Sequence, residues 1–107
     1  MRYLVTMETI DSGEILGPAE NAALLEDVVI PSLQTFSEWE KAGTIRGGLL
    51  AGRRGVAFIV DADSNEALSD MLGSLPVWGT AEVEVTPLES IDHRLNSLKA
   101  IAQQMRG

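Results

Sequence analysis

The amino-acid sequence predicts an α+β domain in which two helices cover one face of a four-stranded antiparallel sheet. Segments that alternate apolar and polar residues, typical of strands, are interspersed with segments whose apolar residues recur every three or four positions, typical of helices. Their order along the chain is strand, helix, strand, strand, helix, strand. A chain of 107 residues is long enough for one such domain with its own core.

The first strand is predicted over residues 2–8, RYLVTME, because Tyr3, Val5 and Met7 alternate onto one face. The next stretch, residues 11–18 (DSGEILGP), contains two glycines and a proline and is typical of a loop. A loop is therefore predicted between the first strand and the first helix.

A long amphipathic helix is predicted from Ala19 to a stop at Gly43. Pro31 interrupts it and lacks a backbone donor, so we expect either a kink or a restart with Pro31 in the first turn of a second piece. The apolar positions of this helix are Ala22, Leu25, Val28, Val29, Leu33, Phe36 and Trp39.

Two short strands, residues 44–51 and 55–62, are predicted to form a hairpin around Gly52, Arg53 and Arg54. Residues 56–60, VAFIV, are apolar at every position, which is typical of a strand covered on both faces. The second helix is predicted over 64–74, with Asp63 as its cap and Glu66 completing a capping box. The fourth strand is predicted over 80–86, ending at Pro87.

This order is the split βαβ, or ferredoxin-like, arrangement, in which the fourth strand lies at an edge. Two helices cover only one face of the sheet, whereas the apolar third strand calls for a cover on both. A second copy of the same sheet is the simplest cover, so we expect a homodimer through the sheets. We assign residues 1–88 to this domain.

Residues 89–107 are predicted to add a C-terminal helix that begins after a cap at Ser90. It has no place in the four-stranded unit, so packing on a neighbouring subunit, as in a larger ring, is favoured over folding back. Its apolar residues are spaced alternately four and three positions apart, a pattern typical of a helix that packs along another helix. They are Ile91, Leu95, Leu98, Ala102 and Met105, and we call them the seam.

Composition excludes several classes of partner and chemistry. The net charge is −8 and lysines and arginines do not cluster, which argues against nucleic acid and against an anionic membrane surface. Cysteine is absent, so disulfides, thiolate metal sites and cysteine nucleophiles are excluded. The sequence shows no signal-like start and no apolar run long enough for a bilayer, so we expect a cytoplasmic protein.

Three stretches resemble the muconolactone isomerase-like proteins: AGTIR at residues 42–46, GVAFIVDADSNEAL at 55–68 and SLPVWGTAEVEVTPL at 74–88. The resemblance covers nearly all of residues 1–88. It implies a ferredoxin-like chain that forms dimeric α/β barrels, often in larger rings, and that moves a double bond in a small unsaturated lactone by proton transfer without a cofactor. In those isomerases the first helix is rich in Lys and Glu and the hairpin carries His and Tyr, whereas this chain has VVIPSLQTFSEWEK and AGRRG there.

Proton transfer without a cofactor needs an acid and a base close to the moving proton. Arg46, flanked by Ile45 and two glycines, is the candidate for gripping a carboxylate, with a salt bridge as the alternative. Glu82 is the candidate base, sharing a strand face with Glu84, and the alternative is an acidic edge strand that stays solvated.

Tyr3, Trp39 and Trp78 are candidates for the wall of a ligand pocket, with core packing as the alternative. His93 is the only histidine and is expected to be a solvated or subunit-contact residue. No metal-ligand spacing is present, so no metal is expected, and the resemblance implies that no cofactor is used. The predicted function is a cofactor-free isomerase that acts by proton transfer on a small unsaturated or lactone metabolite bound between sheet and first helix. The alternative is a non-catalytic homo-oligomeric assembly or ligand-binding protein of the same fold.

Overall fold

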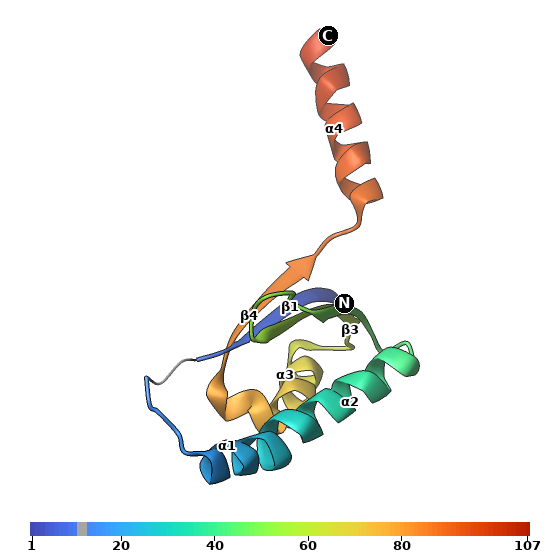
Figure 1. The fold of residues 1–107 in the computed structure, drawn as a ribbon. Helices are drawn as coiled ribbons and strands as arrows, with labels where there is room; N and C mark the ends of the chain where they lie inside the picture. The colour runs from blue at the N-terminus through green and yellow to red at the C-terminus, as the bar shows by residue number, and fades with distance from the viewer. Residues whose placement is uncertain (11–12) are drawn as a thin grey trace.

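The computed structural model describes residues 1–10 and 13–107 and confirms the predicted order of elements (Figure 1). The loop predicted over 11–18 falls partly outside this description, at residues 11 and 12. The elements are β1 Arg2–Thr9, α1 Pro18–Leu24, the π-helix η1 Leu25–Val29, α2 Ile30–Lys41, β2 Ile45–Leu49, β3 Gly55–Asp61, α3 Asn65–Gly73, the 3-10 helix η2 Pro76–Thr80, β4 Ala81–Leu88 and α4 Ile91–Arg106.

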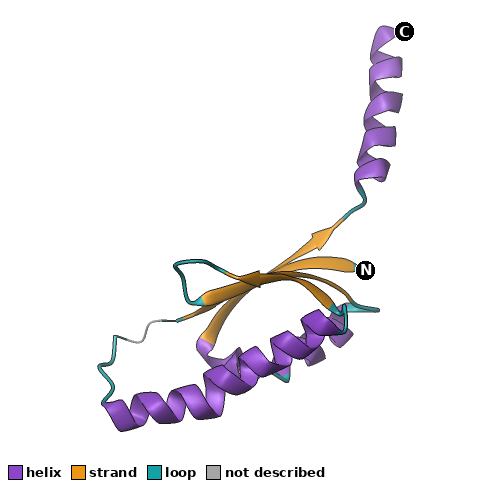
Figure 2. Cartoon of the chain, turned by 45° about the vertical axis from the view of Figure 1, so that its right-hand side comes forward, coloured by secondary structure: helices purple, strands orange, loops and turns teal. Residues whose placement is uncertain are grey.

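The four strands form one antiparallel sheet in the order β2-β3-β1-β4, so β4 is an edge strand as predicted. The long helix and α3 pack on the same face of this sheet (Figure 2). We call the opposite face, which no described helix covers, the open face. The α+β class, the ferredoxin-like order and the extra C-terminal helix are thereby confirmed.

The core lies between the sheet and the helices because every second residue of the central strands points there. Tyr3, Val5 and Met7 of β1 are buried, as the alternation predicted. Burial of these apolar side chains supplies most of the favourable free energy of a small domain. The remaining core residues are Phe36, Ile45, Val56, Phe58, Val60, Leu68, Leu72 and Leu75.

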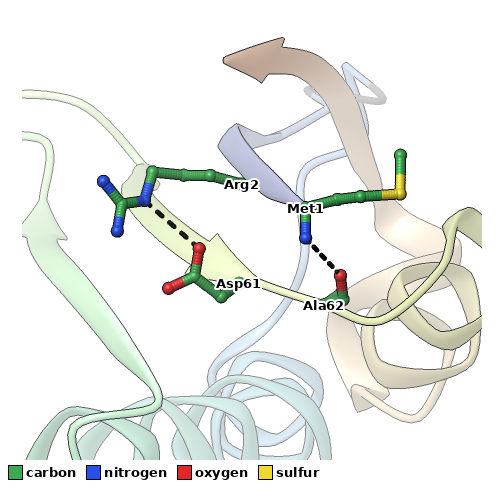
Figure 3. Close-up of polar contacts among 4 residues, drawn as sticks. All are labelled: Met1, Arg2, Asp61 and Ala62. Carbon is green, nitrogen blue, oxygen red and sulfur yellow. Dashed lines mark hydrogen bonds and ion pairs between the residues drawn. The ribbon is translucent and has the colours of Figure 1, made fainter. Parts of the chain in front are cut away.

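The ladder between β1 and β3 continues to the N-terminus of the chain. The amino group of Met1 donates to the carbonyl oxygen of Ala62 at 3.0 Å, and Arg2 Nε lies 3.2 Å from Asp61 Oδ1 (Figure 3). These interactions hold the chain end against β3. Because both are exposed to solvent, they add little to the stability.

In the single chain β3 is covered on one face only. Val56, Phe58 and Val60 are buried, whereas Ile59 on the open face remains 40% exposed. The expectation of cover on both faces is not met within one chain, and a second copy over the open face stays a prediction.

The long helix divides just before Pro31, where a π-helical turn separates α1 from α2. The backbone N–H of Ile30 donates to the carbonyl of Leu25, five residues back, which makes residues 25–29 a π-helical turn. Proline removes a donor and crowds the preceding carbonyls, and a widened turn just before it accommodates both effects. The α-helix then restarts with Pro31 in its first turn, the second of the two expected outcomes.

Two predicted element ends are wrong. The cap of α3 is Ser64 and not Asp63, because the Ser64 hydroxyl accepts the N–H of Ala67 at 3.0 Å. Strand β4 does not stop before Pro87 but runs to Leu88, paired with β1. Proline lacks only the donor, and an edge strand leaves one side of its backbone without a partner strand.

Helix α4 begins as predicted, with the Ser90 hydroxyl accepting the N–H of His93 at 3.1 Å. It then extends away from the rest of the chain (Figure 1). The Cα radius of gyration is 18.7 Å and the longest dimension 71 Å, whereas a compact domain of this length has a radius of about 13 Å. Within the described residues, α4 buries none of its side chains.

Two adjacent glycines of β2 allow a stability test of the close packing between β2 and β3. A Cβ at Gly47 would overlap the carbonyl oxygen of Ala57 and lie 2.7 Å from Phe58 Cα, whereas at Gly48 it would meet no described atom within 4 Å. We expect Gly47→Ala to lower the free energy of unfolding by about 1–3 kcal/mol, because backbone must shift. Gly48→Ala, the control, should be neutral or stabilise by up to about 1 kcal/mol.

Urea unfolding followed by circular dichroism measures both changes. Equal midpoints for the two variants would contradict the close approach of β2 to β3 at Gly47.

Candidate functional site

A groove lies between α2 and the β2–β3 edge of the sheet. Its volume is about 240 Å³ and it is open to solvent along one side. Its floor and walls are mostly apolar, with two polar side chains at the rim. The lining residues are Leu33, Phe36, Ser37, Glu40, Ile45, Gly48, Leu49 and Val56.

The helix side of the groove follows from helical periodicity. Leu33, Phe36, Ser37 and Glu40 are spaced three, four and seven residues apart, so they lie on one side of α2. Phe36 is held from both directions, with its ring centroid 5.7 Å from that of Phe58 and 5.7 Å from that of Trp39. These contacts fix the wall from which Ser37 and Glu40 project.

The sheet side follows from the alternation of β2. Ile45 and Leu49 point toward the helices, and Gly48 between them contributes only backbone, which leaves the groove shallow there. Among the described lining residues, Glu40 is the only ionisable one. The groove therefore offers an apolar bed with one carboxylate and one hydroxyl.

Sequence reasoning missed Glu40 and Ser37. It treated residues 19–43 as a helix with an apolar stripe and did not ask which polar residues border that stripe. The signal was available, because Glu40 follows Phe36 by four positions and Leu33 by seven.

The predicted catalytic pair lies on the open face, away from this groove. Arg46 pairs with Ile59 of β3, Ile59 with Leu4 of β1, and Leu4 with Thr86 of β4, so Arg46 and the β4 residues occupy opposite edges of the sheet. Three strand spacings amount to about 14 Å. Glu82 is displaced further along β4, so one chain alone does not bring Glu82 and Arg46 together.

The three predicted wall residues are distributed over the helix side of the molecule. Tyr3 is buried, and its hydroxyl donates to Asn65 Oδ1. Trp39 is half-buried, and its ring meets that of Phe36 edge-on, but Trp39 does not itself line the groove. Trp78 lies in η2 and is 41% exposed. Of the described residues that line the groove, none is among these three.

A hydrogen bond anchors α2 to the turn that carries Trp78. Ser32 is buried in α2, and its hydroxyl accepts the backbone N–H of Val77 at 3.1 Å. This hydrogen bond gives the backbone N–H of Val77 an acceptor and connects α2, which forms one wall of the groove, to η2. The anchor therefore helps to set the position of the groove wall.

A second concavity, more open to solvent, lies at the base of α4, between the end of β4 and the first turns of the helix. Arg94 Nε there lies 2.8 Å from Glu89 Oε1, in an exposed ion pair. The hydroxyl of Ser90 caps the helix by accepting the backbone N–H of His93. Across the ranges 1–10 and 13–107, no three Asp, Glu or His side chains gather as a metal site would require, and no described helix is long and apolar enough to cross a membrane.

The fold and the groove define a small ferredoxin-like α+β protein with an open, mostly apolar groove between its long helix and its sheet. The chain belongs to the muconolactone delta-isomerase family, whose model matches residues 1–93. It is also similar to a crystal structure of muconolactone isomerase, with 27% identity and a TM-score of 0.62; the alignment covers 85% of this chain and 95% of that one. Comparison with curated protein sequences gave no match.

Two serines of α2 test the anchor. Ser32→Ala leaves the Val77 N–H without its acceptor, so we expect the free energy of unfolding to fall by about 1–3 kcal/mol. Ser37→Ala removes an exposed hydroxyl from the same helix and should change it by less than about 0.5 kcal/mol. Urea titration of both variants provides the measurement, and indistinguishable unfolding curves would refute the anchoring role.

Proposed function

We propose that the protein is a cofactor-free isomerase that moves a double bond in a small unsaturated lactone or related metabolite. Family membership supports the reaction class, and the groove between α2 and β2 supports a small, largely apolar substrate. The observation that carries the proposal is the single carboxylate, Glu40, at the rim of an otherwise apolar bed. A base beside an apolar surface is suited to taking a proton from carbon.

One carboxylate is sufficient for the reaction. Glu40 removes the proton from the carbon next to the lactone carbonyl, and the electron pair moves into a dienolate. The carboxylic acid then returns the proton to the far carbon of the conjugated system, so the double bond shifts and the carboxylate is regenerated. Both carbons must face the same side chain, which a shallow groove with one acidic rim permits. The Ser37 hydroxyl is placed to donate to the developing oxyanion.

The residues predicted from the sequence define a competing location for the same chemistry. In that variant of the proposal Glu82 is the base and Arg46 binds the anionic group. The binding roles predicted for Tyr3, Trp39 and Trp78 belong to the helix side of the molecule and not to this face. Because Arg46 and Glu82 lie at opposite edges of the open face, this site requires a homodimer through the sheets, in which β2 of one copy lies over β4 of the other.

Substitution of Glu40 tests the proposed base. Glu40→Gln keeps the shape of the side chain and removes the base, so we expect kcat for lactone isomerisation to fall by about 10²–10⁴-fold. Glu38→Gln, on the same helix but outside the groove lining, is the control and should leave kcat unchanged. Turnover of muconolactone and related unsaturated lactones is followed by ultraviolet absorbance.

Arg46→Gln and Glu82→Gln run in the same assay. A loss of activity in these two variants but not in Glu40→Gln would move the site to the open face. Absence of turnover in the unmodified protein over the whole lactone panel would reject the isomerase.

The second candidate is a non-catalytic assembly or ligand-binding protein of the same fold. The exposed apolar seam of α4 favours it, as does a groove lined by only one ionisable side chain among the described residues. Saturable binding of a lactone without turnover, measured by calorimetry, would support this candidate. The cytoplasmic location belongs to the same proposal and is not needed for either assay.

A further inference from the structure

Helix α4 presents an apolar seam that its own chain does not cover. Ile91 and Met105, at its two ends, are 85% and 83% exposed. Leu95, Leu98 and Ile101 between them are also exposed. Several large apolar side chains on one side of an exposed helix indicate a docking surface.

The helix is largely an addition to the family fold. The family model ends at residue 93, near the start of α4, so the seam from Leu95 onward lies outside the matched region. Its role therefore has to be inferred from this chain's own residues.

Charge indicates what α4 binds. Residues 91–106 carry Arg94, Lys99 and Arg106 against Asp92, a net charge of +2. Residues 1–90 carry five basic and fifteen acidic residues, a net charge of −10. A basic helix on a strongly acidic chain is electrostatically complementary to the body of another copy.

The two basic side chains that border the seam are available for such an interaction. Lys99 and Arg106 are seven residues apart, so they lie on the same side of α4, beside Leu95 and Leu98. In contrast to Arg94, neither makes an ion pair within residues 1–10 and 13–107.

Pairing of α4 with the α4 of another copy is disfavoured by the same charges. Two helices of net charge +2 repel each other, and 16 residues are close to the lower limit for a two-stranded coiled coil in water. The acidic body is the better partner.

The groove between α2 and β2 has the matching chemistry. Its rim carries Leu33, 39% exposed, and Leu49, 64% exposed, together with the carboxylate of Glu40. The helical segment 18–41 carries five acidic residues against Lys41 alone. An apolar seam bordered by bases therefore meets an apolar groove bordered by acids.

In this structure α4 does not lie over the groove of its own chain. It follows β4 after only Glu89 and Ser90, at the edge of the sheet opposite β2, and it buries none of its side chains within the described residues. Helix α4 also points away from its own domain (Figure 1).

We propose that α4 of one copy lies across the mouth of the α2–β2 groove of a second copy, with Leu95 and Leu98 against Leu33 and Leu49. Lys99 or Arg106 then stands near Glu40 of the second copy. This inference builds on the proposed function by completing the same groove: α4 becomes the roof of the pocket and supplies a cation to the lactone oxygen as charge develops on it. Its test measures contact and does not depend on turnover.

The absence of cysteine from the sequence makes cross-linking specific. Single variants Leu98→Cys and Leu49→Cys of the full chain, one of them isotopically labelled, are mixed in equal amounts and oxidised. The expected result is a disulfide between residue 98 of one chain and residue 49 of the other, identified by mass spectrometry. Both positions are exposed, so these variants should fold normally.

Two further samples test the other two surfaces on which α4 of another copy could dock. Leu98→Cys alone reports α4–α4 pairing, and Leu98→Cys mixed with Ile59→Cys reports docking on the open face. A dominant disulfide in either of these samples, or no disulfide in the first mixture, would overturn the proposal.

A charge-matched pair tests the electrostatic part. Lys99→Gln with Arg106→Gln, added to the Leu98→Cys chain, should lower the cross-link yield with Leu49→Cys several-fold. Ala100→Glu with Gln104→Glu removes the same net charge on the other side of α4 and should leave the yield unchanged. An equal loss in both would show that overall charge, and not the seam-bordering bases, drives association.

Absence of isomerase activity with an intact cross-link would reject the proposed function and leave the α4 contact standing.

Discussion

Strand β1 sets the arrangement of the whole molecule, because it lies between β3 and β4 and pairs with both along its full length. Its alternation places Tyr3, Val5 and Met7 under the helices. A shift of one residue in either pairing would turn all three to the open face. The same register places Arg46 and Glu82 on the open face, while Ile45 and Leu49 of β2 line the groove under α2.

The groove and the open face therefore have different chemical characters for the same geometric reason. Side chains that point toward the helices form an apolar bed, and those that point away keep the charges of β2 and β4. One chain has a bed with a single carboxylate and an uncovered face with separated charges. In the proposals above, a second copy completes both features: its α4 covers the groove, and its sheet covers the open face.

The sequence was informative wherever a pattern is local. Alternation with period two located β1 and β4, a continuous apolar run located β3, and the three-to-four spacing located the long helix and α4. It failed at ends decided by competition, since Asp63 and Ser64 are both good caps and only the backbone geometry selects Ser64. Pro87 fits within β4 because β4 is an edge. Helical spacing alone places Glu40 beside Leu33 and Phe36, but the presence of a groove there depends on the relative placement of α2 and β2, which no local pattern encodes. The division at residue 88, the cytoplasmic location and the roles of the five predicted site residues stay predictions.

The π-helical turn at residues 25–29 divides the long helix into two parts whose residues are out of phase with each other. A widened turn has the effect of one inserted residue, which rotates the residues before it by about 100° relative to the residues after it. All described residues of α1 are exposed, whereas Val28 and Val29 of η1 are half-buried and η1 contacts η2, so the rotation disturbs no packing of α1 itself. The surface of α1 can consequently change in sequence, or even in helical phase, without altering which residues of α2 face the groove.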